Sequence, residues 1–498
     1  MGDWNLAITL DRTDPRPLYL QLVAAVEEGI RRGRFRPGDS LPGTRALAGM
    51  LGVNRTTALT AYRELQAEGW IRVAPDSGTY VADQPPFSLD EVPGISAGDS
   101  ASWRSATPRS VPFYQPVAAT LDQFRLLPDV PDLRLTPTSA IHRAYGRVLK
   151  LHPERLLQPG WDPRGLLDLR ISLCAMLRDL RGMAVEPGNL LLTRGLMSSL
   201  NLVSRVLFAP GDAVALEDPG FFRIAEAFRA AGASLHPVPS DAQGLDVAAL
   251  EELLERVPVR LVCLTAGPQH PTMVPLAPER RRRLLELAER YDFRILEGDP
   301  GLGFHRERNP GLPLASADRT GRVLYYSGLE QILAPGLQVG FLAGEAGLIK
   351  TLAQQRQLVD WPGNQVQEAA IEETLRDGEV LRHLRRLRKV VEERRATMVD
   401  RMLLHLHPAV RVRDPGEGLA LWAQVADDIP IARWTERCAA RGVVFYPGCL
   451  YDFHRRDIPF ICVGFASCNL DEQNEACLRM AEALAEVRGP SRLSGQAR

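Results

Sequence analysis

Apolar residues recur with helical spacing in the first part of the chain. They fall mostly three or four positions apart over residues 18–30, which predicts a helix, and RGRFRPGD then predicts a turn. A shorter helix follows in TRALAGMLG, where Gly52 is a stop signal. Asn54 is a good N-cap for a third helix in RTTALTAYRELQAEG. The segments WIRV and TYVA around Ser77-Gly78 predict two short strands joined by a turn.

A helix, a helix-turn-helix and a β-wing together form a DNA-binding plan. Arg55 to Thr57 would meet base edges or phosphates in the major groove, Arg45 would contact a phosphate, and Gly78 would approach a groove at the wing tip. The candidate DNA-binding residues are Arg45, Asn54, Arg55, Thr56, Thr57, Tyr62, Arg63, Gly78 and Thr79. The alternative is a module for protein contacts. Net charge does not decide between them, because residues 1–82 hold ten Arg and nine Asp or Glu.

The rest of the chain predicts an α/β body. Residues 83–120 are rich in Pro, Ser and Gly and predict a flexible linker. Helical stretches then alternate with the short strands LLLT, AVALE, RLVCLTA, FRILEG, RVLYYSG and VGFLAG. This alternation favours a mainly parallel sheet with helices on both faces, over about residues 121–375. LALWAQV, VVFYPG and ICVGFAS predict a small α+β subdomain over about residues 376–485, followed by a tail at 486–498.

Composition excludes several classes of protein. The 498 residues are 45% hydrophobic with a net charge of −1, which is ample for two or more packed domains. No apolar run is long enough to span a bilayer, so we expect a cytoplasmic protein without membrane contact. The seven cysteines form no C-x-x-C pair and are expected to be buried or idle thiols, and we expect no metal site. The only lysines are Lys150, Lys350 and Lys389, and none lies at a strand-to-loop turn.

The N-terminal pattern closely resembles the GntR-type winged helix. PLYLQL, GRFRPGDSLPGTRALAGMLGVNRTTALTAYRELQAEGW and SGTYV match that family's spacing. Gly43 departs from it, because the family commonly has Ser there. The resemblance implies binding of double-stranded DNA by the residues given above.

A second resemblance rests on YYSGLEQILAPGLQVG, residues 325–340. It is similar to the loop Tyr-x-Gly-Thr-x-Ser-Lys-x-Leu-x-Pro-x-Leu-Arg-x-Gly of fold-type I aminotransferases, whose lysine binds pyridoxal 5′-phosphate (PLP). Gln331 stands at the lysine and Gln338 at the arginine. A glutamine amide forms no Schiff base. The resemblance covers about residues 121–485. Together the two halves are similar to the MocR/GabR subfamily of GntR regulators, which implies a domain-swapped homodimer.

Further family positions depart from PLP chemistry. The Asp that pairs with the pyridine nitrogen falls at Gly298, unless a one-residue shift gives Asp299 that role, and the ring-oxygen Tyr falls at Gly301 or Pro300. At the phosphate cup, Gly328, Glu330 and Gln338 replace two hydroxyl residues and the arginine, whereas backbone amides near Gly195 and Ser198 would still bind an anion. Cys462 replaces the arginine that clamps the substrate carboxylate, and the Pro-Thr-Gly element reads Pro271-Thr272-Met273.

These departures favour a DNA-binding regulator with a degenerate aminotransferase-like body, no catalytic residues and no covalent PLP. The body is then either a dimerisation scaffold or a pocket refitted for a neutral or cationic effector. The candidate pocket residues are Phe221, Asp299, Glu330, Gln331 and Gln338. Two alternatives remain: a working PLP aminotransferase with an accessory domain, and a regulator that binds PLP non-covalently.

Overall fold

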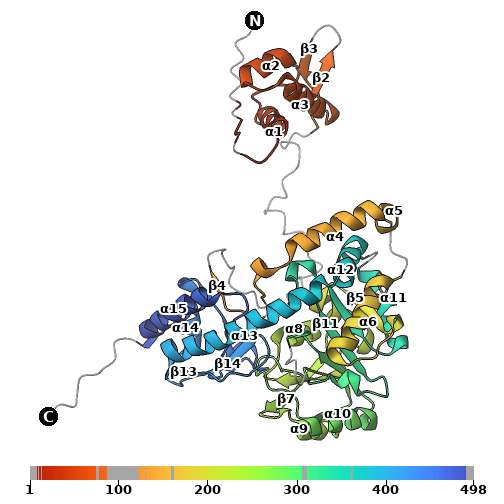
Figure 1. Cartoon of the computed structure of the whole chain (residues 1–498), viewed down its shortest axis with the longest axis vertical. Coiled ribbons are helices and arrows are strands. Elements are labelled where there is room, and N and C mark those ends of the chain that lie inside the picture. Colours follow the sequence, from red (N-terminus) through yellow and green to blue (C-terminus); the bar gives the residue numbers. More distant parts are fainter. Residues whose placement is uncertain are drawn as a thin grey trace, which may run out of the picture. The chain divides into compact units, whose positions relative to one another are not determined.

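The computed structural model of the chain has two compact units, Met1–Ser110 and Val111–Arg498 (Figure 1). The structure describes residues 8, 10–12, 14–74, 78–86, 123–128, 130–158, 162–304, 311–360 and 363–488. Ser77 in the predicted wing turn and most of the predicted linker lie outside these described residues.

Three helices and a three-stranded antiparallel sheet form the described part of the N-terminal unit. They are α1 (Leu18–Arg31), α2 (Thr44–Leu51), α3 (Arg55–Ala67), β1 (Ser40–Leu41), β2 (Ile71–Ala74) and β3 (Gly78–Val81), with strand order β1-β3-β2. Leu22, Leu47 and Leu65 bring the inner faces of the helices into one apolar cluster. Gly52 ends α2 with a φ of +61°, and the Asn54 side chain accepts a hydrogen bond from the Thr56 amide at 3.0 Å. These two residues fix the turn between α2 and α3.

An eight-stranded sheet of order β5-β12-β11-β10-β9-β6-β7-β8 forms the centre of the second unit. Its strands are β5 (Leu190–Thr193), β6 (Ala213–Asp218), β7 (Ser234–Asp241), β8 (Gly244–Leu245), β9 (Val259–Leu264), β10 (Arg294–Gly298), β11 (Val323–Gly328) and β12 (Gly340–Ala343). The strands from β11 to β7 are parallel, and β12 is antiparallel to both β11 and β5. In β11, Val323 and Tyr325 pack on one face, and Leu324 and Tyr326 pack on the other.

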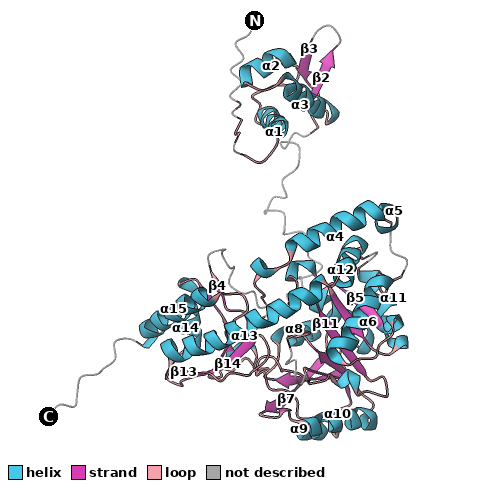
Figure 2. Cartoon of the chain, in the orientation of Figure 1, coloured by secondary structure: helices cyan, strands magenta, loops and turns pink. Residues whose placement is uncertain are grey.

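Helices cover both faces of this sheet (Figure 2). The face that carries Leu324 packs against α7 (Gly195–Leu207), α8 (Phe222–Ala230) and α11 (Ala346–Val359). The opposite face packs against α6 (Leu167–Arg181), α9 (Val247–Leu254) and α10 (Pro278–Tyr291). The remaining helices of this subdomain are α4 (Thr138–Leu151), α5 (Pro153–Leu156) and α12 (Gln365–Arg376).

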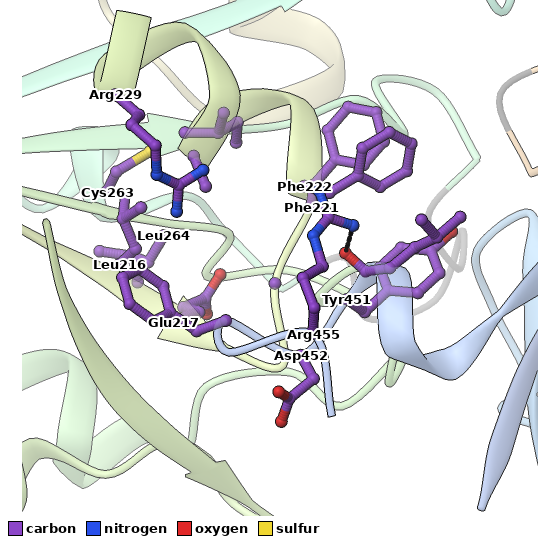
Figure 3. A pocket seen from close by; sticks show the side chains of 15 residues that line it. Leu216, Glu217, Phe221, Phe222, Arg229, Cys263, Leu264, Tyr451, Asp452 and Arg455 are labelled. Carbon is purple, nitrogen blue, oxygen red and sulfur yellow. Dashed lines mark hydrogen bonds between the residues drawn. The ribbon is translucent and has the colours of Figure 1, made fainter. Parts of the chain in front are cut away.

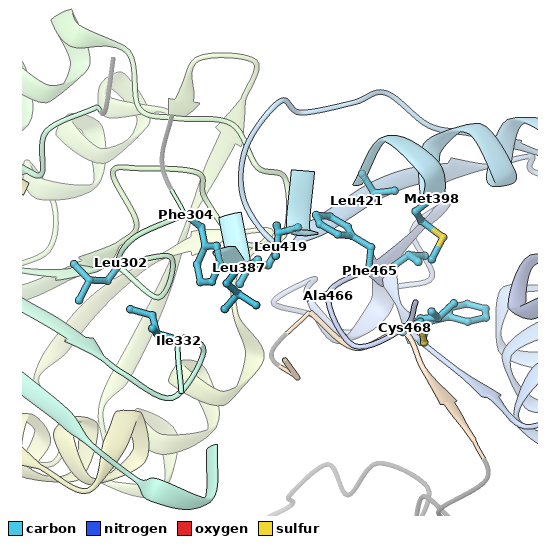
Figure 4. Packing of buried hydrophobic residues seen from close by; sticks show 14 of the residues in the cluster. Leu302, Phe304, Ile332, Leu387, Met398, Leu419, Leu421, Phe465, Ala466 and Cys468 are labelled. Atoms are coloured by element: carbon cyan, nitrogen blue, oxygen red, sulfur yellow. The ribbon is translucent and has the colours of Figure 1, made fainter. Parts of the chain in front are cut away.

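The long helix α13 (Glu379–Leu406) connects the large subdomain to the small one. The small subdomain contains β13 (Val410–Arg411), β14 (Ala420–Val425), α14 (Ile431–Ala440), β16 (Tyr446–Pro447), β17 (Phe460–Gly464) and α15 (Leu470–Arg488), with sheet order β13-β14-β17-β16. Figure 4 shows Leu302 and Ile332 of the large subdomain, Leu387 and Met398 of α13, and Phe465 of the small subdomain within one hydrophobic cluster. The two subdomains therefore share a core.

Two strand regions differ from the sequence-based expectation. β7 was not predicted, and it contains Pro237 and Pro239, which argue against a central strand. It lies near the edge of the sheet, where only the two-residue β8 flanks it. The initial segment, expected in the large subdomain, contributes β4 (Phe124–Arg125), which pairs in parallel with β15 (Val443–Val444) beside α14.

Other expectations concern cysteines, metals and membranes. All seven cysteines are free, and all except Cys449 are buried. Across the described ranges, no group of His, Cys, Asp or Glu residues is arranged to hold a metal ion. None of the helices in those ranges is both long enough and apolar enough to cross a membrane.

Candidate nucleic-acid interface and effector cavity

The start of α3 presents polar side chains to solvent. Arg55 and Thr56 are exposed in its first turn, Thr57 is half-buried, and Arg63 is exposed two turns later. Arg45 is exposed on α2. The unpaired amides of a helix N-terminus attract anions, and the arginines add full positive charges beside them.

The arginines of this surface have no carboxylate partner. Among the described residues, no ion pair joins Arg45, Arg55 or Arg63 to an acidic side chain. Four other arginines of the same unit are paired: Arg16 with Asp14, Arg31 with Glu27, Arg32 with Glu28, and Arg72 with Asp83. The charges of Arg45, Arg55 and Arg63 on α2 and α3 are therefore not neutralised by an ion pair and can meet a phosphate backbone.

Two of the predicted DNA-binding residues have buried side chains. Tyr62 is 4% exposed and its hydroxyl donates to the Pro42 carbonyl oxygen at 2.8 Å. It lies on the same inner face of α3 as Ala58 and Leu65. Thr79 is 8% exposed within β3, whereas Gly78 beside it is exposed with a φ of +122°. Asn54 is exposed, and its side-chain oxygen caps α3.

A cavity of about 360 Å³ opens at the carboxyl ends of the parallel strands of the second unit. Ligands bind at this edge in open α/β sheets. Most of the residues that line the cavity lie at the end of β11 or in the segments that follow β5, β6, β9, β10 and β11, and Pro128 comes from the segment after β4. They are Pro128, Arg194, Gly195, Leu196, Met197, Phe221, Arg223, Ile224, Thr265, His270, Pro300, Tyr326, Ser327, Gly328, Glu330, Gln331, Pro335 and Gln338.

Four of the five predicted pocket residues, Phe221, Glu330, Gln331 and Gln338, line this cavity. Asp299 instead lines a neighbouring cavity of about 40 Å³, which Gln331 also borders. The Asp299 carboxylate accepts a hydrogen bond from the Tyr325 hydroxyl at 2.7 Å and forms an ion pair with the buried Arg181, with Nε 2.7 Å from Oδ2. Its charge is therefore balanced by the core of the large subdomain.

The carboxylate of Glu330 lies against the first turn of α7. A Cβ atom added to Gly195 would lie 3.3 Å from Glu330 Cδ, and one added to Gly328 would lie 3.0 Å from it. Burial raises the pKa of Glu330 to about 7, although hydrogen bonds from its own amide and the Leu196 amide oppose the shift. Glu330 thus fills the space between the end of β11 and the start of α7.

The Tyr326 side chain fills a second region of the cavity wall. A Cβ atom on Gly298, which pairs with Tyr326 across β10 and β11, would lie 2.6 Å from Tyr326 Cζ and closer still to its hydroxyl oxygen. Gly301 is different, because no atom lies within 4 Å of an added Cβ. Tyr326 therefore takes the space into which a side chain at position 298 would project.

His270 is a cavity residue that the sequence analysis missed. Its ring contacts that of Phe221 edge to face, with centroids 5.2 Å apart, and its Nε2 lies 3.2 Å from the Tyr451 hydroxyl. Burial lowers the pKa of His270 to about 3, so the imidazole is neutral. The altered element Pro271-Thr272-Met273 was the available signal, because His270 directly precedes it.

Three positions at which the aminotransferase resemblance expects a lysine or an arginine carry uncharged side chains: Gln331, Gln338 and Cys462. The Gln331 Oε1 atom is buried without a hydrogen-bond partner among the described residues. Gln338 is exposed with a φ of +47°. Cys462 is buried in β17 within an apolar cluster. Lys150, Lys350 and Lys389 are exposed on α4, α11 and α13, away from the lining of the cavity.

A smaller cavity of about 40 Å³ lies behind Phe221, between β6, α8 and the loop at 450–455 (Figure 3). Arg455 lies in this loop. Its guanidinium donates to the Leu450 carbonyl at 2.9 Å and forms an ion pair with Glu226 at 3.0 Å. This volume is large enough for water but too small for an organic ligand.

The comparison with known families decides the identity of the second unit. The family model "Aminotransferase class I and II" matches residues 154–427, which is more than half of the chain. The chain belongs to the aminotransferase class I and II family. The model "Bacterial regulatory proteins, gntR family" matches residues 18–81 of this aminotransferase-family chain. The predicted fold class, a GntR-type winged helix joined to a fold-type I aminotransferase body, is confirmed by both matches and by the structural likenesses below.

Relatives include both regulators and enzymes. The chain is 27% identical to the probable rhizopine catabolism regulatory protein MocR of Rhizobium meliloti, over 92% of each chain. It is 29% identical to the HTH-type pyridoxine biosynthesis transcriptional regulator PdxR of Corynebacterium glutamicum, over 80% of this chain and 81% of the relative. The crystal structure of Pyrococcus horikoshii kynurenine aminotransferase has a TM-score of 0.68 and 28% identity, and covers 74% of this chain and 92% of its own.

Proposed function

We propose that the protein is a DNA-binding transcriptional regulator of the MocR type. In this proposal the winged helix binds promoter DNA, and the aminotransferase-like body dimerises and senses a small molecule without covalent PLP. The observation that carries the proposal is the likeness to the Rhizobium meliloti regulator over 92% of both chains, which includes the winged helix as well as the body. A relative that is an aminotransferase alone has no counterpart of the first unit, since kynurenine aminotransferase covers only 74% of this chain.

The arginine surface supports the DNA-binding part of this proposal. Arg55 and Thr56 at the start of α3 enter the major groove, Arg45 on α2 contacts the backbone, and Gly78 brings the wing close to a groove. A homodimer in which each winged helix packs on the partner's large subdomain would present two such surfaces. Two surfaces fit paired or repeated half-sites.

A mobility-shift assay tests DNA binding. The probe is the DNA upstream of the protein's own gene, random DNA is the competitor, and the salt concentration is varied. Arg55→Ala should weaken binding and reduce the slope of log affinity against log salt by about 1. Arg32→Ala is the matched control and should bind as the wild type does, because Arg32 is paired with Glu28 at the end of α1. No preference for the upstream DNA over random DNA at any salt concentration would refute the proposal.

The cavity supports effector sensing rather than transamination. Gln331 stands where the resemblance puts the Schiff-base lysine, and the three lysines of the chain are exposed and do not line the cavity. The volume of about 360 Å³ suits a small organic molecule. The buried Gln331 Oε1 atom has no partner among the described residues and can accept a hydrogen bond from a ligand, and the Glu330 carboxylate favours a neutral or cationic ligand. If the body is only a dimerisation scaffold, no small molecule will change operator affinity.

A second candidate function is a PLP-dependent enzyme or PLP-binding regulator. It is favoured by 28% identity over 372 residues to aromatic-amino-acid aminotransferase 1 of Thermococcus litoralis. The visible spectrum of the purified protein with and without added PLP separates these possibilities. We expect a colourless protein with no aldimine band. A yellow protein whose band is bleached by borohydride would establish the enzyme-like alternative, and heat of PLP binding without that band would establish a non-covalent sensor.

A further inference from the structure

The first turn of α7 has the features of an anion-binding site, which we call the anion seat. α7 has 13 residues and begins at Gly195, directly after β5, so its first backbone amides have no partner within the helix. These amides and the helix dipole favour a negative charge at this point. The seat opens into the cavity, because Gly195, Leu196 and Met197 all line it.

A side chain of the protein already lies in this seat. The backbone amides of Leu196 and of Glu330 itself stabilise the charged form of the Glu330 carboxylate and lower its pKa against the effect of burial. Gly195 and Gly328 leave the room that the carboxylate takes, since a Cβ on either would come within 3.3 Å of Glu330 Cδ. The Glu330 carboxylate is therefore largely withdrawn from water, and backbone amides at this point stabilise its negative charge.

The cavity arginines are engaged elsewhere. The Arg194 guanidinium forms an ion pair with Asp360 at 2.6 Å. That of Arg223 lies over the Phe222 ring, 5.3 Å from its centroid. Gln338 supplies no charge at the position that the aminotransferase loop gives to an arginine. A phosphate group entering the cavity would therefore meet a carboxylate in its seat and paired or stacked cations around it.

We propose that the Glu330 carboxylate is the resident ligand of the anion seat at α7, so that the cavity accepts unphosphorylated molecules and rejects phosphate esters. PLP is among the rejected molecules, and the residues present do not fit its phosphate. This inference deepens the proposed effector site, on which it rests for the existence of a ligand. It assigns Glu330 the role of a specificity-determining residue.

Titration calorimetry on the full-length protein with inorganic phosphate tests this proposal. The wild type should bind no phosphate at millimolar concentration. Glu330→Ser empties the seat, leaves a hydroxyl that hydrogen-bonds the anion, and should raise phosphate affinity by about a hundredfold or more, as expected when a like charge close by is removed. Glu330→Gln keeps the shape and a hydrogen-bond acceptor in the seat, so its affinity for phosphate should stay well below that of Glu330→Ser.

A matched control exists on another helix. The Glu345 side chain accepts hydrogen bonds from the Gly347 and Leu348 amides at 2.6 and 2.8 Å, and so caps α11 at the protein surface outside the cavity. Glu345→Ser also frees a helix N-terminus, but this end of α11 lies outside the cavity, so any phosphate affinity that it gains should be well below that of Glu330→Ser. If Glu345→Ser gains as much as Glu330→Ser, or if the wild type already binds phosphate as tightly as Glu330→Ser, the proposal is wrong.

A second pair of probes ties the effect to the phosphate group. Glu330→Ser should gain affinity for pyridoxal 5′-phosphate and none for pyridoxal, and equal gains for both would overturn the proposal. Circular dichroism and the mobility shift with upstream DNA establish that each variant is folded. The two proposals can fail separately. If the wild type does not shift the upstream DNA but Glu330→Ser gains phosphate binding, the proposed regulator is rejected and the inference about Glu330 stands.

Discussion

The contact between Gly298 and Tyr326 makes a sharp test of how the cavity is packed. The two residues pair across β10 and β11 and both are buried. A Cβ atom on Gly298 would lie 2.6 Å from Tyr326 Cζ, about 1 Å inside the usual contact distance of carbon atoms. Strain of this kind in a packed core costs about 1–3 kcal/mol. We therefore expect Gly298→Ala to lower the free energy of unfolding by that amount.

Two further variants isolate the cause. Gly301→Ala should be neutral or slightly stabilising, because no atom lies within 4 Å of the added methyl group. In a Tyr326→Leu background, Gly298→Ala should lose most of its cost, because the atoms that it meets are gone. The coupling free energy between the two positions should be at least about 1 kcal/mol.

The coupling free energy between positions 298 and 326 is measured by urea unfolding of the wild type, both single variants and the double variant. Tryptophan fluorescence and circular dichroism follow the unfolding. Any cost of Tyr326→Leu itself cancels in the cycle. The reasoning is refuted if Gly298→Ala costs the same with Tyr326 as with Leu at position 326. It is also refuted if Gly298→Ala is as harmless as Gly301→Ala.

Three other perturbations follow from single contacts. Tyr62→Phe removes the hydrogen bond to the Pro42 carbonyl and should destabilise the first unit by about 1 kcal/mol in urea unfolding, with unchanged affinity for operator DNA in a mobility shift. Arg181→Met leaves the buried Asp299 carboxylate without its ion-pair partner and should cost about 3–5 kcal/mol, whereas Arg181→Met with Asp299→Asn should recover much of this loss by the same assay. Burial raises the pKa of Glu330 from 4.5 to about 7, so the native state holds the Glu330 proton more tightly than the unfolded state does. The free energy of unfolding should therefore fall by up to about 3 kcal/mol as the pH rises from about 4.5 to about 7. Urea midpoints at about pH 5 and about pH 8 should show this loss in the wild type but not in Glu330→Gln.

The local sequence pattern predicted the N-terminal unit well because its determinants are local. Helical spacing over residues 18–30, the stop at Gly52 and the cap at Asn54 all act within a few residues of chain. Tyr62 shows the limit of that approach. Its position between Ala58 and Leu65 already placed it on the inner face of α3, and periodicity should have outweighed its polar hydroxyl.

The strands that escaped prediction had no usable local signal. β4 and β15 have two residues each, too few for an alternating pattern, and β4 is defined only by a partner more than 300 residues away in the sequence. β7 carries two prolines that lower its strand propensity, and its place beside β6 depends on the sheet as a whole. Tertiary pairing decides such segments.

The sequence also predicted some features of the cavity and not others, because some depend on local order and some on contacts between distant segments. The order of residues in YYSGLEQILAPGLQVG was enough to bring Glu330, Gln331 and Gln338 to one cavity. The direction of the Glu330 side chain was not accessible from that order, because the α7 amides that it meets lie about 135 residues earlier in the chain. The contact of Tyr326 with Gly298 and that of His270 with Phe221 likewise join separate segments.

Two large side chains at the cavity, Glu330 and Tyr326, each lie against glycine residues. This packing bears on whether the cavity is suited to a ligand. Where Glu330 enters the start of α7, the neighbouring positions are Gly195 and Gly328, and where Tyr326 enters the cavity, the facing position is Gly298. Random loss of cofactor residues would leave larger voids or clashes, since packed interiors tolerate neither. Each intruding side chain here has a glycine opposite it, and a cavity of about 360 Å³ remains beside them. This complementarity supports the proposed effector site, in which the cavity holds a ligand other than PLP.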